Sequence, residues 1–175
     1  WYRGTADAMY QNIDFLRESH EPYVIITSGD CVYKIDFNKM LEYHINKKAD
    51  ITVGYTKLAA GQDDPTRFGV MQMDTDGRVF GFEEKPVITD NMTVSTGIYI
   101  IRRRLLIGLL EKANAEERYD FVQDILVRYK DVKKIFAYKH EGYWQNISTI
   151  SSYYQTNMDF LKRDVREYFF RDYPN

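Results

Sequence analysis

The order of apolar and polar positions predicts strands and helices that alternate along the chain. Residues 21–28 form a short, β-branched and almost continuously apolar run, as expected for a strand covered on both faces. Helical spacing follows over 36–46, with Asp36 in the N-cap position, and a second strand-like run covers 49–56. A strand, a helix and a strand within about 35 residues predict a βαβ unit with parallel strands and a right-handed crossover.

The middle of the chain predicts a β-hairpin. Residues 68–73 form a half-buried strand pattern, Asp76-Gly77 is a strong turn signal, and residues 78–85 resume as a strand that stops at Pro86. Further strands are expected at 94–101 and 134–139, and helices at 102–112, 120–129 and 149–162. We therefore expect most of one α/β domain, with a mixed, mostly parallel sheet flanked by helices and an inserted β-hairpin.

Composition supports a folded domain and narrows the classes of partner. The 175 residues are 44% apolar and 15% aromatic with a formal net charge of −2, which excludes intrinsic disorder and a basic nucleic-acid footprint. No apolar run approaches the ~18 residues that would span a bilayer, so no membrane partner is expected. The single cysteine, Cys31, excludes a disulfide within the chain and a multi-cysteine zinc site, and fits a reducing cytoplasm.

Asp30 is the first candidate for chemistry, because it directly follows the strand-like run that ends in Ser28-Gly29. In open α/β sheets, ligands bind in the crevice outside the carboxyl ends of the strands. A carboxylate there is well placed for Mg²⁺, which takes one or two carboxylates together with substrate phosphates. The alternative is that Asp30 only caps the next turn.

Three other segments carry polar groups that allow two interpretations. Glu83-Glu84-Lys85-Pro86 offers an ammonium for a sugar phosphate and a carboxylate for hydroxyls, or is a solvated strand end stopped by proline. Near Gly4-Thr5, one interpretation is that backbone N–H groups bind a phosphate or a base edge. The other is that Thr5 is a simple N-cap. The segment from Tyr143 to Thr149 lines a pocket, or contains a buried Trp144 beside a satisfied amide.

Six short strings occur together in a specific order. They are Trp1-Tyr-Arg-Gly-Thr-Ala-Asp-Ala, Gly29-Asp30-x-x-Tyr33-Lys34, Phe68-Gly69-Val70, Phe82-x-Glu84-Lys85-Pro86, Ser95-Thr-Gly97-Ile98-Tyr99 and Tyr143-Trp144. Each string alone is weak, but the ordered set resembles the bacterial glucose-1-phosphate adenylyltransferases (ADP-glucose pyrophosphorylases) of glycogen synthesis. The resemblance runs from Trp1 to about Leu161.

This resemblance implies a Rossmann-like nucleotidyltransferase domain and a reaction. An oxygen of glucose 1-phosphate attacks the α-phosphorus of ATP and pyrophosphate leaves, a reaction that depends mostly on positioning and charge neutralisation. By analogy with the family, Asp30 would be the catalytic, Mg²⁺-binding carboxylate. The remaining implied contacts are those of Glu84 and Lys85 with glucose 1-phosphate, of Ser95, Gly97 and Gly69 with the sugar, and of Gly4 and Thr5 with the nucleotide.

One string departs from the family pattern, in which Tyr-Trp-Arg-Asp-Val-Gly-Thr supplies the second metal carboxylate. Here it is Tyr-Trp-Gln-Asn-Ile-Ser-Thr, so that Asn146 replaces the aspartate, Gln145 the arginine and Ser148 the glycine. An amide oxygen can bind a metal but carries no negative charge, so we expect Mg²⁺ binding to be weak or lost. The family's usual histidine after the first aspartate is Cys31.

These departures match the regulatory-type second subunit of Gram-positive glycogen operons, which is poorly active alone and forms a hetero-oligomer with a catalytic subunit. A working adenylyltransferase or related sugar nucleotidyltransferase remains an alternative, as does a non-enzymatic module that senses sugar phosphate or nucleotide. The resemblance also implies that the phosphate loop lies upstream of Trp1, and that a left-handed β-helix domain lies beyond Asn175. We therefore expect residues 1–175 to be a nucleotidyltransferase domain that cannot catalyse by itself.

Overall fold

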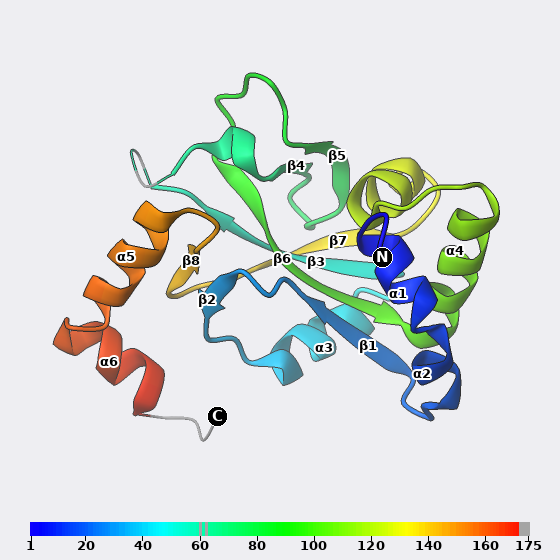
Figure 1. The fold of residues 1–175 in the computed structure, drawn as a ribbon, viewed down its shortest axis with the longest axis horizontal. Coiled ribbons are helices and arrows are strands. Elements are labelled where there is room, and N and C mark those ends of the chain that lie inside the picture. Colours follow the sequence, from blue (N-terminus) through cyan, green and yellow to red (C-terminus); the bar gives the residue numbers. More distant parts are fainter. Residues whose placement is uncertain (60, 62, 172–175) are drawn as a thin grey trace.

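The computed structural model describes residues 1–59, 61 and 63–171. Its centre is one mixed six-stranded sheet in the order β5-β4-β6-β3-β7, with β1 also paired to β6 (Figure 1). The strands are β1 (Tyr23–Thr27), β3 (Ile51–Lys57), β4 (Gly69–Met73), β5 (Val79–Glu84), β6 (Thr93–Arg102) and β7 (Ile135–Lys139).

The expected mixed sheet flanked by helices is confirmed, but the expectation of mostly parallel pairing is wrong. β6 lies between β1 and β3 and pairs antiparallel with both, and the one parallel pair in the described sheet is β3 with β7. The helix α3 (Phe37–Asn46) thus connects two strands that run in the same direction without being neighbours. β6 is almost wholly buried, as expected for a strand with neighbours on both sides and helices on both faces.

The alternation of side chains along β6 divides the core between the two faces of the sheet. Tyr99 and Ile101 pack in the larger cluster, against helices α1 (Thr5–Gln11) and α4 (Arg103–Ala115). Ile98 and Ile100 point to the other face, where they pack with Met40 of α3. The remaining described helices are α2 (Ile13–Glu18), the 3₁₀ turn η1 (Pro65–Arg67), the π-helix η2 (Val122–Val127), α5 (Ile150–Asp159) and α6 (Arg163–Phe170).

Local signals in the sequence place several of these boundaries. The hairpin of β4 and β5 is confirmed, and Gly77 in its turn has φ +86°, a conformation that favours glycine. Asp36 caps α3 by accepting hydrogen bonds from the backbone N–H groups of Asn38 and Lys39. Thr149 caps α5 in a reciprocal arrangement with Ser152. Within the described residues, no helix is both long enough and apolar enough to cross a membrane.

A second, two-stranded sheet joins distant parts of the chain. β2 (Cys31–Tyr33) pairs antiparallel with β8 (Trp144–Asn146), and the register sets Cys31 opposite Asn146. Figure 1 shows this small sheet at the end of the main sheet that also carries α5 and α6. The pairing brings Asp30, which directly precedes β2, next to the last residue of β8.

Candidate functional site

A pocket of about 620 Å³ opens at the end of β1, where the chain turns through Ser28 and Asp30. Its walls come from β4, β5 and β6, from the two-stranded sheet and from the start of η2. Eight of the residues expected at the site line it, namely Thr5, Asp30, Gly69, Glu84, Lys85, Ser95, Gly97 and Asn146. The fold thus brings together around one cavity residues that are spread over most of the chain.

Gly4, the ninth expected residue, is not among the lining residues. It packs against the backbone of Tyr119, so closely that an added Cβ would lie 2.4 Å from the Tyr119 carbonyl oxygen. The N–H groups of Ala6 and Asp7 also donate to this oxygen, over 2.8 and 3.2 Å. The start of α1 is therefore tied to the loop before η2, and these two N–H groups are already hydrogen-bonded within the protein.

The backbone of β6 shapes one wall of the pocket at Gly97. This glycine has φ +74°, and a Cβ on it would lie 2.8 Å from the Cβ of Ser28. Its N–H donates to Ser95 Oγ over 3.2 Å, and its carbonyl accepts from the N–H of Ser28 over 2.9 Å. The absence of a side chain at position 97 lets the end of β1 approach β6 closely.

The amide of Asn146 hydrogen-bonds to Asp30. Asn146 Nδ2 donates to Asp30 Oδ2 over 3.2 Å and to the Asp30 carbonyl oxygen over 3.3 Å. The N–H of Ser148 donates to Asn146 Oδ1 over 3.1 Å, and the Ser148 hydroxyl bonds to the same oxygen. A backbone N–H needs an acceptor, so this contact sets the amide with its oxygen toward Ser148 and its nitrogen toward Asp30.

Hydrogen bonds around Asp30 stabilise its ionised form. Partial burial acts to raise the pKa of Asp30, but hydrogen bonds from Ser28 Oγ and Asn146 Nδ2 outweigh it and hold that pKa below its usual value. The neighbouring thiol responds in the opposite direction. Burial, with a smaller contribution from the Asp30 carboxylate, raises the pKa of Cys31 to about 11, so this is a packed thiol and not a reactive thiolate.

Glu84 and Lys85 line the pocket where β5 ends beside the start of β4. Glu84 is in register with Gly69, and its carboxylate lies 3.7 Å from Lys85 Nζ. Burial raises the pKa of Glu84, and the charge of Lys85 partly opposes this effect. Lys85 itself has φ +48°, a conformation that is unusual outside glycine and is common at functional sites.

The donor set beside Asp30 does not fit a two-carboxylate magnesium site. Both oxygens of Asp30 accept hydrogen bonds, and the oxygen of Asn146 is turned toward Ser148 and Arg67. Among the described residues, no group of three or more His, Cys, Asp or Glu side chains is arranged to hold a metal ion. One carboxylate beside an amide nitrogen is a poor match for a hard cation that prefers oxygen ligands.

Comparisons with known proteins identify the family. The family model described as "Nucleotidyl transferase" matches residues 2–163. The chain belongs to the nucleotidyl transferase family. It is 41% identical to a glucose-1-phosphate adenylyltransferase of Bacillus subtilis (strain 168) over 167 residues, which are 94% of this chain and 43% of that protein.

Two further curated relatives of the nucleotidyl transferase family carry the same name. A glucose-1-phosphate adenylyltransferase of Clostridium botulinum (strain Alaska E43 / Type E3) is 42% identical over 94% of this chain and 43% of its own length. The one from Bacillus cytotoxicus is 41% identical over 93% of this chain and 43% of its own length. The chain therefore spans less than half the length of these relatives.

Several residues that line this pocket were not singled out from the sequence. They are Ser28, Arg67, Asp120 and Phe121. The N–H of Phe121 donates to Thr5 Oγ1 over 2.9 Å, which places the start of η2 against the start of α1. A π-helix is rare and often marks a functional site, but its spacing is not distinguishable from an α-helix by apolar periodicity alone.

Proposed function

We propose that this chain is the nucleotidyl transferase domain of a subunit of glucose-1-phosphate adenylyltransferase, and that the subunit is a catalytically weak, regulatory one. The reaction would be that of ATP with glucose 1-phosphate to give ADP-glucose and pyrophosphate, in glycogen biosynthesis in the cytoplasm. The names of the relatives and the gathering of the expected residues in one pocket support the reaction class. A catalytic adenylyltransferase subunit would be the partner in a hetero-oligomer.

In this proposal the lining residues of the pocket divide between the parts of the two substrates. Lys85 and Glu84 would bind the phosphate and hydroxyl groups of glucose 1-phosphate, since an ammonium pairs with phosphate and a carboxylate accepts from hydroxyls. Ser95, Gly97 and Gly69 would form the surface against which the sugar lies. Thr5, which accepts a hydrogen bond from the N–H of Phe121, would lie against the nucleotide.

The single observation that carries the regulatory part of the proposal is the hydrogen bond from Asn146 Nδ2 to Asp30 Oδ2. In the family's reaction a magnesium ion neutralises the phosphates of ATP, and phosphoryl-type transfer depends on that neutralisation. Here the amide N–H of Asn146 faces Asp30, the remaining carboxylate. These residues would therefore hold a magnesium ion poorly, while the rest of the pocket could still bind and orient a substrate.

The test is the rate of ADP-glucose formation from ATP, glucose 1-phosphate and Mg²⁺ by the full-length protein. The unaltered protein would be compared with Asn146→Asp combined with Gln145→Arg, and with Gln145→Arg alone as the matched control without a new carboxylate. We expect little turnover by the unaltered protein and by the control, and a gain of about tenfold or more in the double variant.

A second arm adds the candidate catalytic subunit to the unaltered protein. A change in the kinetics of that subunit is the expected result, whereas unchanged kinetics would favour a sensing module that acts elsewhere. Robust turnover by the unaltered protein alone would contradict the regulatory proposal and would support a working adenylyltransferase. A working adenylyltransferase remains an alternative because the chain keeps Asp30 and Lys85, and both line the pocket.

A further inference from the structure

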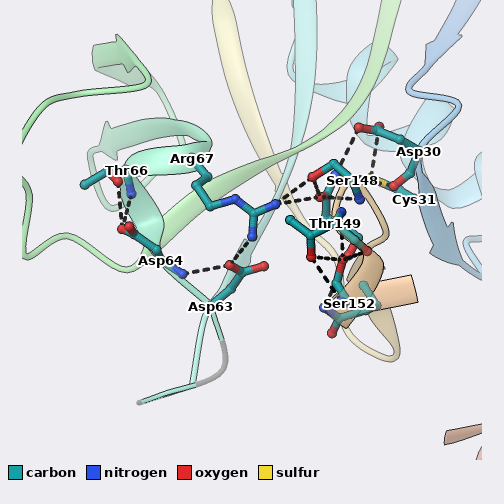
Figure 2. A network of polar contacts seen from close by, with 11 residues as sticks. Asp30, Cys31, Asp63, Asp64, Thr66, Arg67, Ser148, Thr149 and Ser152 are labelled. Carbon is teal, nitrogen blue, oxygen red and sulfur yellow. Dashed lines mark hydrogen bonds and ion pairs between the residues drawn. The ribbon is translucent and has the colours of Figure 1, made fainter. Parts of the chain in front are cut away.

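Arg67, the last residue of η1, lines the pocket, and its guanidinium points toward Ser148 (Figure 2). Its Nη1 donates to Asp63 Oδ1 over 2.7 Å. Its Nη2 donates to Ser148 Oγ over 2.6 Å and lies 3.5 Å from Asn146 Oδ1. The guanidinium is thus held beside the hydrogen-bonded pair of Asn146 and Asp30, in the place where the donor set for a metal ion is poor.

The charged residues that line the pocket determine whether it can bind a phosphate group. The described lining contains the carboxylates of Asp30, Glu84 and Asp120, and its cations are Arg67 and Lys85. A phosphate monoester carries nearly two negative charges near neutral pH. Such a group cannot be stably held beside these carboxylates without positive charge, because close like charges repel strongly in a partly buried site.

Arg67 and Lys85 stand at adjacent ends of the hairpin strands. The N–H of Lys85 donates to the carbonyl of Phe68, the residue after Arg67, over 3.1 Å, and Gly69 pairs with Glu84. The two cations therefore border the same edge of the pocket. Lys85 Nζ lies 3.7 Å from the carboxylate of Glu84. Arg67 forms a 2.7 Å ion pair with Asp63 and also contacts Asn146.

Arg67 forms one ion pair, with Asp63, and the neutral side chain at position 146 adds no second one. An amide oxygen accepts a hydrogen bond from the guanidinium without cancelling its charge, whereas an aspartate there would form an ion pair with it. A guanidinium has five N–H donors in a planar fork, and the three contacts above leave capacity for a ligand. The side chain keeps 32% of its surface exposed.

We propose that Arg67 binds the phosphate group of the ligand in this pocket, so that Arg67 and Lys85 together hold a phosphate monoester without a divalent cation. Arg67 has no assigned role in the resemblance described above. The identity of the monoester as glucose 1-phosphate rests on the proposed function, whereas the role of Arg67 toward phosphate does not.

The test is isothermal titration calorimetry of the full-length protein with glucose 1-phosphate, once in Mg²⁺ and once in EDTA. Two further ligands represent the two parts of glucose 1-phosphate: inorganic phosphate carries the charged group, and glucose carries the sugar. The informative variant is Arg67→Gln, and Ser148→Ala is its matched control, because it removes the 2.6 Å contact and keeps the charge. Arg67→Lys keeps the positive charge but lacks the planar set of N–H donors of the guanidinium. Thermal unfolding shows which variants are folded.

We expect equal affinity for glucose 1-phosphate in Mg²⁺ and in EDTA. Arg67→Gln should weaken this affinity about tenfold or more, as expected for the loss of a charged hydrogen bond, and Arg67→Lys should weaken it less. Ser148→Ala should stay within about threefold of the unaltered protein, and the weak affinity for glucose should not change in any variant.

Unchanged affinity in folded Arg67→Gln, or loss of binding in EDTA, would overturn the proposal. Binding of inorganic phosphate that depends on Arg67, without binding of glucose 1-phosphate, would support the role of Arg67 and contradict the proposed sugar substrate. If neither anion binds to the unaltered protein, the phosphate site itself is refuted. A loss of the same size in Ser148→Ala would show that Arg67 acts through its structural contact and not on the ligand.

Discussion

Asn146 Nδ2 donates a hydrogen bond to Asp30 Oδ2 over 3.2 Å, between two residues that lie 116 positions apart in the chain. The pairing of β2 with β8 produces this contact, because it sets Cys31 opposite Asn146 and so brings the preceding Asp30 within reach. At this point of the pocket a carboxylate faces an amide and not a second carboxylate. The site therefore carries one negative charge fewer than it would with an aspartate at position 146.

Asn146→Asp should raise the pKa of Asp30. The substitution removes a hydrogen bond that stabilises the ionised form and adds a like charge about 3 Å away. The measurement is an NMR titration of the Asp30 carboxyl carbon in the absence of metal. Asn157→Asp, which adds the same charge on the exposed side of α5, is the control and should leave this pKa in place. An Asp30 pKa that is equal or lower in Asn146→Asp would contradict the hydrogen-bonded arrangement.

Gly97→Ala should destabilise the domain and disturb the site. An alanine at φ +74° costs about 1–2 kcal/mol in the backbone, and its Cβ would lie 2.8 Å from that of Ser28, the residue that hydrogen-bonds to Asp30. Urea unfolding measures the loss. Gly29→Ala is the matched control, since an added Cβ there meets no atom within 4 Å, and we expect a change within about 0.5 kcal/mol. Equal effects of both substitutions would show that the approach of Ser28 to Gly97 does not constrain the fold.

Cys31 should react slowly with thiol reagents in the folded protein. Burial raises its pKa to about 11, so the thiolate is a small minority at pH 8. We expect alkylation by iodoacetamide at pH 8 to be on the order of a hundredfold slower than in the same protein unfolded in urea. Because the chain has one cysteine, the unfolded protein is its own control. Similar rates in both states would mean that the thiol is not packed as described.

His44 should make the stability of the domain depend on pH. It is 1% exposed, its Nδ1 lies 2.7 Å from Thr52 Oγ1, and burial lowers its pKa from 6.5 to about 4. The unfolded chain therefore takes up a proton below about pH 6.5 that the folded protein does not take up until about pH 4. Stability from this group is complete above pH 6.5 and falls between pH 6.5 and 4, by up to about 1.4 kcal/mol per pH unit.

Denaturant unfolding at pH 7 and at pH 4.5 measures the dependence on His44. His44→Gln should reduce the difference in unfolding free energy between the two pH values, whatever its own effect on stability. His20→Gln, at an exposed histidine, should leave that difference unchanged. An undiminished pH dependence in His44→Gln would assign the effect to other groups.

Local patterns were sufficient for much of the fold. The Asp76-Gly77 turn predicts the hairpin, Asp36 predicts the start of α3, and the apolar runs at 21–28 and 49–56 predict β1 and β3. The sequence did not reveal that β6 lies between those two strands. Side-chain patterns report which faces of a strand are buried, but they do not report which strand supplies the neighbouring hydrogen bonds.

The candidate site shows the same division. Asp30, Glu84, Lys85 and Asn146 were found from ordered strings and from a resemblance, and the structure gathers them around one pocket. Arg67 was missed, because nothing in its local sequence shows that Ser148 and Asn146 lie within reach of its guanidinium.

The sequence by itself determined the class of fold, the family strings and the exchange of a carboxylate for an amide at position 146. These features depend only on the types of residues and on how they are spaced over short stretches of the chain. They are therefore the same in the folded and in the unfolded protein. Only the tertiary structure decided the order of the strands, the direction in which the Asn146 amide faces Asp30, and the place of Arg67 beside them. Those relationships join residues far apart in the chain, and only the packing of the whole core brings such residues together.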